Sequence, residues 1–328
     1  MEDASSLLRL EDSRGHTSLA LVGVYDGHGG EQASAYLQQH LGNSVAQQLG
    51  LGERAGSFAL PHSATASASS SSASASASAS AEFGFNDESA QRALAGGFDA
   101  CERALVDSQC AAGATAAVVM LQTGGRNLNV AWCGDCRVVL CRSGTAVSLT
   151  TDHTPKHLGE KARVLREGGK IHEGRLAGTL AVTRAFGDLE PQQPLQQQPP
   201  PAQSPAAIHS LPGGVAAPSD VAMFTSAMFT SPPPGAAAQH TSCAAQQQGS
   251  PNKSPGLTAQ PEVVSEPLRS EDEFLILATD GLWDVVSSDE AVRIARADLV
   301  AYEDSQMAAE KLVDVALSRR TEDNVTGE

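Results

Sequence analysis

The stretch Leu19-Ala-Leu-Val-Gly-Val-Tyr25 decides the fold class, because this short apolar run continues directly into Asp26-Gly27-His28-Gly29-Gly30. A run dense in Val and Leu that ends in Asp and Gly predicts a β-strand followed by a turn. An acidic side chain at the end of such a strand is held by a fixed scaffold and can face a cleft. Similar apolar runs that end in Asp, Asn or Gly recur along the chain.

Further runs rich in Val, Leu and Ile predict more strands: Thr115–Leu121, Leu128–Cys133, Arg137–Arg142, Leu180–Arg184 and Phe274–Thr279. Helical periodicity predicts helices over Glu31–Leu49, Glu88–Val106, Pro155–Glu167, Ser288–Ala297 and Ser305–Ser318. The strands cluster in the middle of the chain, and the long helices flank them without steady strand–helix–strand alternation. This order favours an α+β layered fold with mostly antiparallel sheets over a doubly wound parallel sheet.

Charge and composition exclude several classes of protein. The 328 residues include 22 Lys and Arg against 38 Asp and Glu, a formal net charge of −16. This balance argues against binding to nucleic acid or to an anionic membrane, because Lys and Arg make most phosphate contacts. No uninterrupted apolar run approaches the roughly 20 residues of a membrane span. Six cysteines are few for this length, so we expect reduced thiols in a soluble protein of the cytoplasm or the nucleus. We also expect the protein to be a monomer.

Two segments have compositions that predict disorder. Within 55–85, every residue from Ser63 to Ala81 is Ser, Ala or Thr. Within 190–256 the chain is rich in Pro and Gln and carries the tandem repeat Ala222-Met-Phe-Thr-Ser. Such segments bury too little apolar surface to offset the entropy lost on folding. We therefore expect one folded domain over 1–328 with two disordered insertions, of which the second could also carry a short docking motif.

Acidic residues recur where an apolar run stops. The positions are Asp26, Asp135 after Val130–Gly134, Asp280 after Phe274–Thr279, and Asp323 before Asn324-Val-Thr326, with Glu2 and Asp3 at the start. Gathered carboxylates repel one another, and Mg²⁺ or Mn²⁺ relieves the repulsion because these ions prefer oxygen ligands. The set is large enough for two ions. Two ions about 3.5–4 Å apart can activate a shared water for phosphoryl transfer.

Each of these features also has a plainer interpretation. Asp-Gly steps such as Asp26-Gly27 and Asp280-Gly281 are frequent in ordinary turns. His28 could act as a general acid, because its ordinary pKa lies near neutrality, or it could simply belong to a turn. Cys133-Gly-Asp-Cys136 has CxxC spacing, but no second pair follows, which favours a strand–turn–strand over a metal or redox site.

Nine motifs in order along the chain resemble the metal-dependent protein serine/threonine phosphatases of the 2C type. They are Met1-Glu2-Asp3, Val24-Tyr-Asp-Gly-His-Gly-Gly30, Gly113-Ala-Thr-Ala116, Gly134-Asp-Cys-Arg137, Asp152-His-Thr-Pro155, Gly168-Gly169, Leu180-Ala-Val-Thr-Arg-Ala-Phe-Gly-Asp188, Phe274 to Asp284, and Asp323-Asn-Val-Thr326. The resemblance implies two packed, mostly antiparallel sheets flanked by helices, a four-layer αββα fold. It covers nearly all of the chain outside the two low-complexity segments.

The resemblance also implies roles for individual residues. One metal would be held by Asp26, Asp280 and Asp323, and the other by Glu2, Asp26 and the Gly27 carbonyl. Asp26 would bridge the two ions and, with His28 as general acid, form the catalytic pair. Asp3 would act through a coordinated water, Asp135 would share a weaker third site with Asp280, and Asn324 and Arg184 would be supports.

The implied function is hydrolysis of phosphoserine and phosphothreonine on other proteins, with two Mg²⁺ or Mn²⁺ ions activating a bridging water. In the family, a phosphate-binding arginine precedes Met1-Glu2-Asp3 by a few residues, and an apolar strand follows Asp323-Asn-Val-Thr326; neither is present here. We therefore expect this chain to be truncated at both ends. The alternatives are a pseudophosphatase that binds phosphoproteins without turnover, and a scaffold whose Met-Phe repeat recruits a partner.

Overall fold

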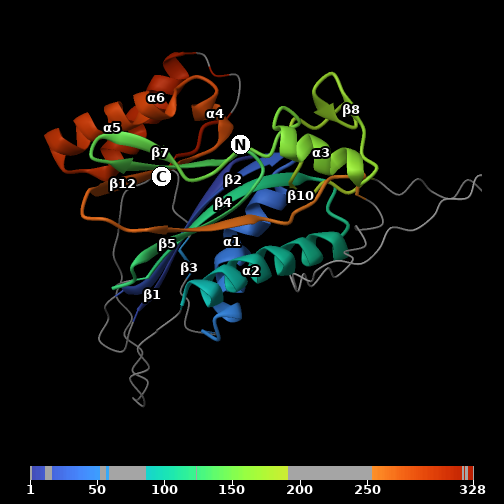
Figure 1. Ribbon diagram of the computed structural model, residues 1–328, viewed down its shortest axis with the longest axis horizontal. Helices are drawn as coiled ribbons and strands as arrows, with labels where there is room; N and C mark the ends of the chain where they lie inside the picture. The colour runs from blue at the N-terminus through green and yellow to red at the C-terminus, as the bar shows by residue number, and fades with distance from the viewer. Residues whose placement is uncertain are drawn as a thin grey trace, which may run out of the picture. The chain divides into compact units, whose positions relative to one another are not determined.

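The central strand β2 (Thr17–His28) pairs antiparallel with β1 (Ala4–Glu11) on one side and with β4 (Gly113–Gln122) on the other. The computed structural model in Figure 1 describes residues 2–11, 17–51, 57–58, 86–122, 124–190, 253–319, 321 and 324–327. Over this part of the chain, β3 (Ser57–Phe58), β5 (Asn127–Cys133) and β11 (Glu262–Pro267) extend the first sheet in the order β11-β5-β4-β2-β1-β3. The two-residue strand β10 (Phe186–Gly187) pairs with the start of β4.

A second sheet has the order β12-β6-β7, with β12 (Asp272–Ala278), β6 (Arg137–Arg142) and β7 (Thr145–Ser148) all antiparallel. Ser143 and Gly144 connect β6 to β7 with φ of 51° and 75°, the backbone that a tight two-residue hairpin requires. A short hairpin of β8 (Ile171–His172) and β9 (Arg175–Leu176) stands apart from both sheets.

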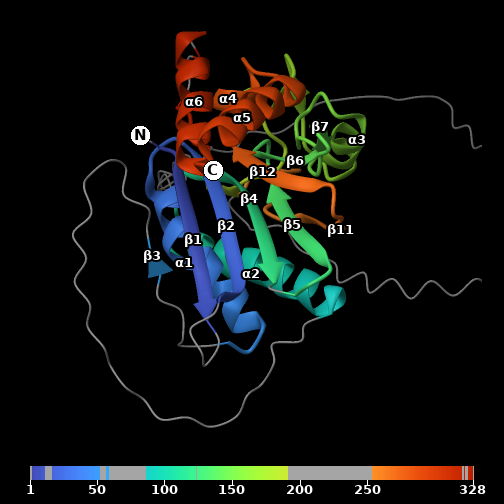
Figure 2. The same ribbon diagram turned by 90° about the vertical axis from the view of Figure 1, so that its left-hand side faces the viewer.

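Helices cover the outer faces of the two sheets (Figures 1 and 2). On the first sheet lie α1 (Gln32–Gln48) and α2 (Asp87–Asp107), and on the second lie α4 (Asp280–Trp283), α5 (Ser288–Tyr302) and α6 (Ser305–Ser318). The remaining helix, α3 (Leu158–Arg166), lies beside the β8–β9 hairpin. Several of these helices begin at capping side chains that accept backbone N–H groups, namely Asn86, Ser287 and Asp304.

The side chains of β4 alternate between two cores, which fixes the layer order. Ala116, Val118 and Met120 pack with α1 and α2, whereas Ala117 and Val119 pack in a separate core with Val138 and Leu277 of the second sheet. Because successive residues of a strand face opposite sides, the first sheet is buried on both faces along β4. The layers therefore run helix, sheet, sheet, helix, and the predicted αββα fold is confirmed.

Most of the predicted elements are present, with ends that differ by up to about five residues, but the predicted strand Leu180–Arg184 is wrong. This segment forms isolated bridges only, Leu180 with Leu176 and Arg184 with Thr258. Its backbone is satisfied by loops: the Thr183 N–H donates to the His153 carbonyl at 2.8 Å. The burial of Val182 and Ala185 explains the apolar composition that predicted a strand.

The two low-complexity segments lie mostly outside the described residues. Lys253 is described and forms an antiparallel bridge with Leu189. Within the described ranges, Cys101, Cys110, Cys133, Cys136 and Cys141 are free thiols. A search of the described helices finds none with the length and apolar character needed to cross a membrane.

Candidate functional site

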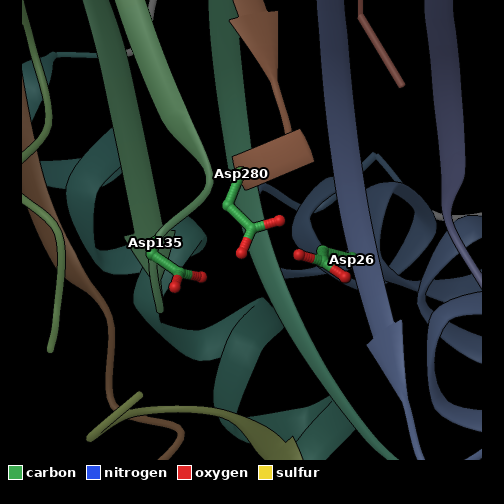
Figure 3. Close-up of side chains that lie close together, drawn as sticks. All are labelled: Asp26, Asp135 and Asp280. Atoms are coloured by element: carbon green, nitrogen blue, oxygen red, sulfur yellow. The ribbon is translucent and has the colours of Figure 1, made fainter. Parts of the chain in front are cut away.

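Three carboxylates converge on one point from three separate elements. Asp26 lies near the end of β2, Asp135 lies in the turn between β5 and β6, and Asp280 begins α4. Each offers an oxygen atom, and these atoms all lie within 4.8 Å of one another. Figure 3 shows the three side chains pointing toward a common space. The structure thus brings together residues that are 109 and 145 positions apart in sequence (135 − 26 and 280 − 135).

Local backbone geometry sets the direction of each carboxylate. Asp26 is opposite Thr115 in the β2–β4 register, so its position is fixed by the centre of the first sheet. Gly134 has φ of 106°, and a Cβ there would overlap the Thr115 side chain. Only glycine fits that turn without strain. Thr279 is extended immediately before α4, which turns Asp280 inward.

The electrostatics of the cluster are unbalanced. Burial raises the pKa of Asp135 to about 7, and the charges of Asp280 and Asp152 add to the effect. All three carboxylates are half-buried, where like charges interact more strongly than in water. Oxygen donors that repel one another in a partly dry site are the donor set that Mg²⁺ and Mn²⁺ bind. The residues present therefore fit a divalent cation.

The start of the chain lies against this cluster. The Ser34 hydroxyl donates to the Glu2 carbonyl oxygen, and a Cβ on Gly27 would overlap that same carbonyl. Asp3 is buried and accepts a hydrogen bond from the Thr279 hydroxyl at 3.0 Å, next to Asp280. Among the described acidic side chains, the group within 4.8 Å does not include Glu2 or Asp3. Their roles as metal ligands, like that of the Gly27 carbonyl, stay predictions.

Asp323 lies outside the described residues, so its predicted role as a ligand also stays a prediction. The residues that follow it lie beside the start of α4. The Thr279 N–H donates to the Thr326 carbonyl at 3.1 Å, and the Thr326 N–H donates to the Thr279 hydroxyl at 3.2 Å. A Cβ on Gly281 would overlap the Asn324 carbonyl oxygen. The segment Asn324–Gly327 is thus held within reach of the cluster.

His28 ends β2 and contacts a residue to which the sequence assigned no role. Its Nε2 lies 2.9 Å and 2.8 Å from the two carboxylate oxygens of Asp188. Burial lowers the pKa of His28, but the hydrogen bond and charge of Asp188, with the charges of Asp135 and Glu2, outweigh burial and raise it. The Gly187-Asp188 step follows an apolar run, as the aspartates of the cluster do, but that local pattern does not indicate the contact with His28.

Arg184, predicted as a support, belongs to a second buried cluster of charges. Its guanidinium Nη2 lies 2.6 Å from Glu160 Oε1, and Arg163 Nη2 lies 2.8 Å from Glu160 Oε2. The Thr183 hydroxyl donates to the same carboxylate at 2.6 Å. Burial alone would raise the pKa of Glu160, but these hydrogen bonds outweigh burial and hold it well below its usual range.

His153 connects the two clusters. Its Nδ1 accepts the Gly134 N–H at 3.1 Å, and its backbone N–H donates to the Gly134 carbonyl at 2.9 Å. Burial lowers the pKa of His153 to about 3, with a further contribution from the charge of Arg184. The ring is therefore neutral, and the 3.5 Å approach of its Nε2 to Glu262 is not an ion pair. The turn that carries Asp135 is fixed by this ring and backbone.

The chain matches a model of the family Protein phosphatase 2C over residues 1–325. It belongs to the protein phosphatase 2C family. A relative from Oryza sativa subsp. japonica, "Probable protein phosphatase 2C 2", is 30% identical over 99% of this chain and 66% of its own length. Another from Arabidopsis thaliana, "Probable protein phosphatase 2C 22", is 28% identical over 94% of this chain. The chain spans only 66% and 57% of the lengths of these two relatives.

Solved structures agree on the fold. A structure titled "Structure of a C.elegans sex determining protein" superposes with a TM-score of 0.61 at 19% identity, covering 99% of this chain and 63% of that one. The serine-threonine phosphatase 2C from Toxoplasma gondii superposes with a TM-score of 0.58 at 18% identity, covering 99% and 92%. At these identities the likeness shows the αββα fold of the 2C phosphatases and nothing finer.

Proposed function

We propose that the protein hydrolyses phosphoserine and phosphothreonine on other proteins in a reaction that depends on Mg²⁺ or Mn²⁺. The observation that carries the proposal is the convergence of Asp26, Asp135 and Asp280 within 4.8 Å. The proposal is supported by membership of the protein phosphatase 2C family. Two bound ions would supply an activated water and offset the charge that develops on the phosphoryl group.

The residues of the chain divide the remaining work. Asp26 and Asp280 would hold metal together with Glu2, the Gly27 carbonyl and Asp323, and Asp135 would complete a weaker third site. His28 lies two residues beyond Asp26 and is one-third exposed at its side chain (32%), so it can meet a substrate at the edge of the cluster. There it would give a proton to the leaving serine or threonine oxygen.

The test is Mn²⁺-dependent release of phosphate from a phosphothreonine peptide. Asp26→Asn and Asp280→Asn each remove one candidate ligand while keeping the shape of the side chain. We expect each to lower kcat/KM by roughly 10²-fold or more, because removal of a group that stabilises developing charge typically has an effect of this size. Asp314→Asn is the matched control, since Asp314 is exposed on α6.

Three outcomes are informative. Loss of activity in the two cluster variants but not in Asp314→Asn supports metal-dependent hydrolysis at this site. Wild-type rates in Asp26→Asn and Asp280→Asn would contradict it. Binding of Mn²⁺ by the wild-type protein without any turnover would instead favour a pseudophosphatase that holds phosphoproteins.

A further inference from the structure

His28 is the last residue of β2 and Asp188 directly follows β10, and these two strands flank β4. In the first sheet β2 and β10 both pair with the start of β4, and His28 and Gly187 are both opposite Gly113 in the register. Asp188 follows Gly187 directly. Side chains on strands that flank a common neighbour are normally kept apart by the residue between them, because adjacent strands are about 4.8 Å apart. Here the two side chains meet within hydrogen-bond distance.

Gly113 is what allows this contact. A Cβ at Gly113 would overlap His28 Nε2 and the carboxylate of Asp188, and these are the nearest atoms to it. Its φ does not lie in the left-handed region, so the backbone itself would accept another residue. The contact between His28 and Asp188 therefore requires glycine at this position, and the backbone conformation of Gly113 does not.

Asp188 is held from several sides. Its N–H donates to the Ala112 carbonyl at 3.2 Å, which fixes it beside β4. The Gly187 N–H donates to Glu102 of α2 at 2.9 Å, and Lys253 Nζ bridges Glu102 and the Ala185 carbonyl at 2.5 and 2.8 Å. The Asp188 side chain is 10% exposed, against 32% for His28. A mostly covered, anchored carboxylate thus holds a more exposed imidazole.

We propose that Asp188 is a positioning residue that fixes the ring and the tautomer of His28, so that Nδ1 is the nitrogen that gives its proton to the leaving oxygen of the substrate. A carboxylate offers only acceptors, and both of its oxygens lie within 2.9 Å of Nε2. Nε2 therefore carries a hydrogen toward Asp188, and Nδ1 is the nitrogen left for exchange. This inference rests on the proposed function for its catalytic part.

A water oxygen forms a bond to phosphorus as the bond between phosphorus and the serine or threonine oxygen breaks, and the electron pair of the broken bond goes to the serine or threonine oxygen. The hydrogen on Nδ1 of the protonated His28 ring passes to the same oxygen, and the electron pair of the Nδ1–H bond stays on the ring. Nε2 keeps its hydrogen and its bond to Asp188 throughout, so the product is the alcohol and a neutral, correctly oriented imidazole.

The first test variant is Asp188→Asn. Asp188 has φ of 55°, and Asn tolerates this left-handed conformation better than most residues, so the fold should be retained. The amide can turn its NH₂ group toward Nε2, which permits the wrong tautomer. The second variant, Gly113→Ala, separates the two side chains without removing either. Asp314→Asn is the control on an exposed surface.

Two substrates separate positioning of an acid from a general structural role. Hydrolysis of a phosphothreonine peptide releases a poor alkoxide leaving group and needs a proton, whereas p-nitrophenyl phosphate releases a good leaving group and does not. We expect Asp188→Asn and Gly113→Ala to lower kcat on the peptide roughly 10- to 100-fold, below the roughly 10²- to 10⁴-fold that a general acid itself contributes, because Asp188 acts through His28. On p-nitrophenyl phosphate we expect a change below about 3-fold. In the His28→Gln background, Asp188→Asn should cause no further loss on the peptide.

Equal losses on both substrates, or no loss on the peptide, would overturn the catalytic role. A second measurement is independent of turnover: ¹⁵N–¹H correlation of the neutral His28 ring should show hydrogen on Nε2 in the wild type and a mixture of tautomers in Asp188→Asn. Hydrogen on Nδ1 in the wild type would overturn the inference. If the wild type releases phosphate from neither substrate, the proposed function fails together with the catalytic role of Asp188, while the NMR result still decides whether Asp188 holds the ring.

Discussion

The molecule buries ionisable groups in two neighbouring places with opposite results. Around Glu160, two guanidinium groups and a hydroxyl surround one carboxylate, and the pKa of that carboxylate is held low. Around Asp135, other carboxylates are the neighbours, and burial with their charge raises its pKa to about 7. A balanced cluster needs nothing more from outside the chain. In an unbalanced cluster the repulsion between carboxylates lowers the free energy of unfolding, and a bound cation removes that repulsion.

This difference distinguishes charges that pair with one another inside the fold from charges that are left for a ligand. Perturbed pKa values occur in both clusters, so perturbation by itself does not mark a site. The direction of the pKa shift distinguishes the two clusters, because the charged form of Glu160 is stabilised and the charged form of Asp135 is not. The comparison leads to opposite expectations for substitutions that neutralise one carboxylate in each cluster.

The largest expected effect is on Glu160. Glu160→Gln removes the negative charge between Arg163 and Arg184 and leaves their guanidinium groups partly unpaired in a buried place. Breaking one side of a buried ion pair typically costs about 3–5 kcal/mol, and we expect the free energy of unfolding to fall by about that amount. Urea unfolding at pH 7 measures it.

Glu167→Gln is the matched control for that measurement. Glu167 also pairs with Arg163, at 2.8 Å, but its side chain is 43% exposed against 5% for Glu160. Exposed pairs contribute about 0–1 kcal/mol, so this variant should unfold almost like the wild type. Equal effects of the two substitutions would contradict the view that Glu160 is the centre of a buried network.

A smaller effect of opposite sign is expected at Asp135. The pKa of Asp135 is about 7 in the folded state, against an ordinary value of 3.8. Between pH 3.8 and pH 7 the folded chain therefore keeps a proton on Asp135 that the unfolded chain has lost. Stability therefore falls as pH rises through this range, and the cost is fully present above about pH 7. In EDTA at pH 8 we expect Asp135→Asn to raise the free energy of unfolding by roughly 1–3 kcal/mol, discounted because the side chain is only half-buried.

Bound metal should reverse the higher free energy of unfolding that Asp135→Asn has in EDTA. A ligand at 100 times its Kd stabilises the folded state by about 2.7 kcal/mol, and the wild type should gain more from Mn²⁺ than Asp135→Asn does. Thermal unfolding of both proteins with and without Mn²⁺ compares the two gains, with Asp314→Asn as the exposed control. A variant that is less stable than the wild type in EDTA would show that the carboxylates do not repel one another as described.

The sequence was informative where local chemistry decides the structure. Arg137–Arg142 and Ser305–Ser318 were predicted with the bounds that the structure shows, because each has a clear apolar pattern between polar ends. The strand β1 was not predicted, since Leu7 and Leu8 are adjacent and break the alternation of an ordinary strand. The polar strand β11 was missed for a similar reason, because it extends the sheet with few apolar residues.

The candidate site was likewise predicted only where a local pattern marks the residue. Asp26, Asp135 and Asp280 each follow an apolar run, and that local pattern is visible in the sequence alone. Asp188 follows a strand of only two residues, and its importance depends on Gly113 in another strand. A local sequence pattern does not indicate a contact that depends on a glycine in another strand. Balanced and unbalanced clusters are likewise indistinguishable in sequence, because the partners of Glu160 are fixed by loop geometry.

The smallest expected effect concerns His153, which contacts both clusters: Gly134 beside Asp135, and Thr183 beside Glu160. Its pKa is about 3 in the folded state against an ordinary 6.5. Between these values the unfolded chain binds a proton and the folded chain does not. Stability from the neutral ring is therefore complete above about pH 6.5 and declines as pH falls, by up to about 1.4 kcal/mol per pH unit.

His153→Gln removes this titration while keeping a carbonyl that can accept the Gly134 N–H. We expect its free energy of unfolding to decline less steeply than that of the wild type between pH 6.5 and pH 5, as measured by urea unfolding in EDTA. His172→Gln, at an exposed position in β8, should keep the wild-type slope. If His153→Gln also keeps that slope, the buried ring is not neutral, and the link between the two clusters has to be sought in the backbone of Gly134 instead.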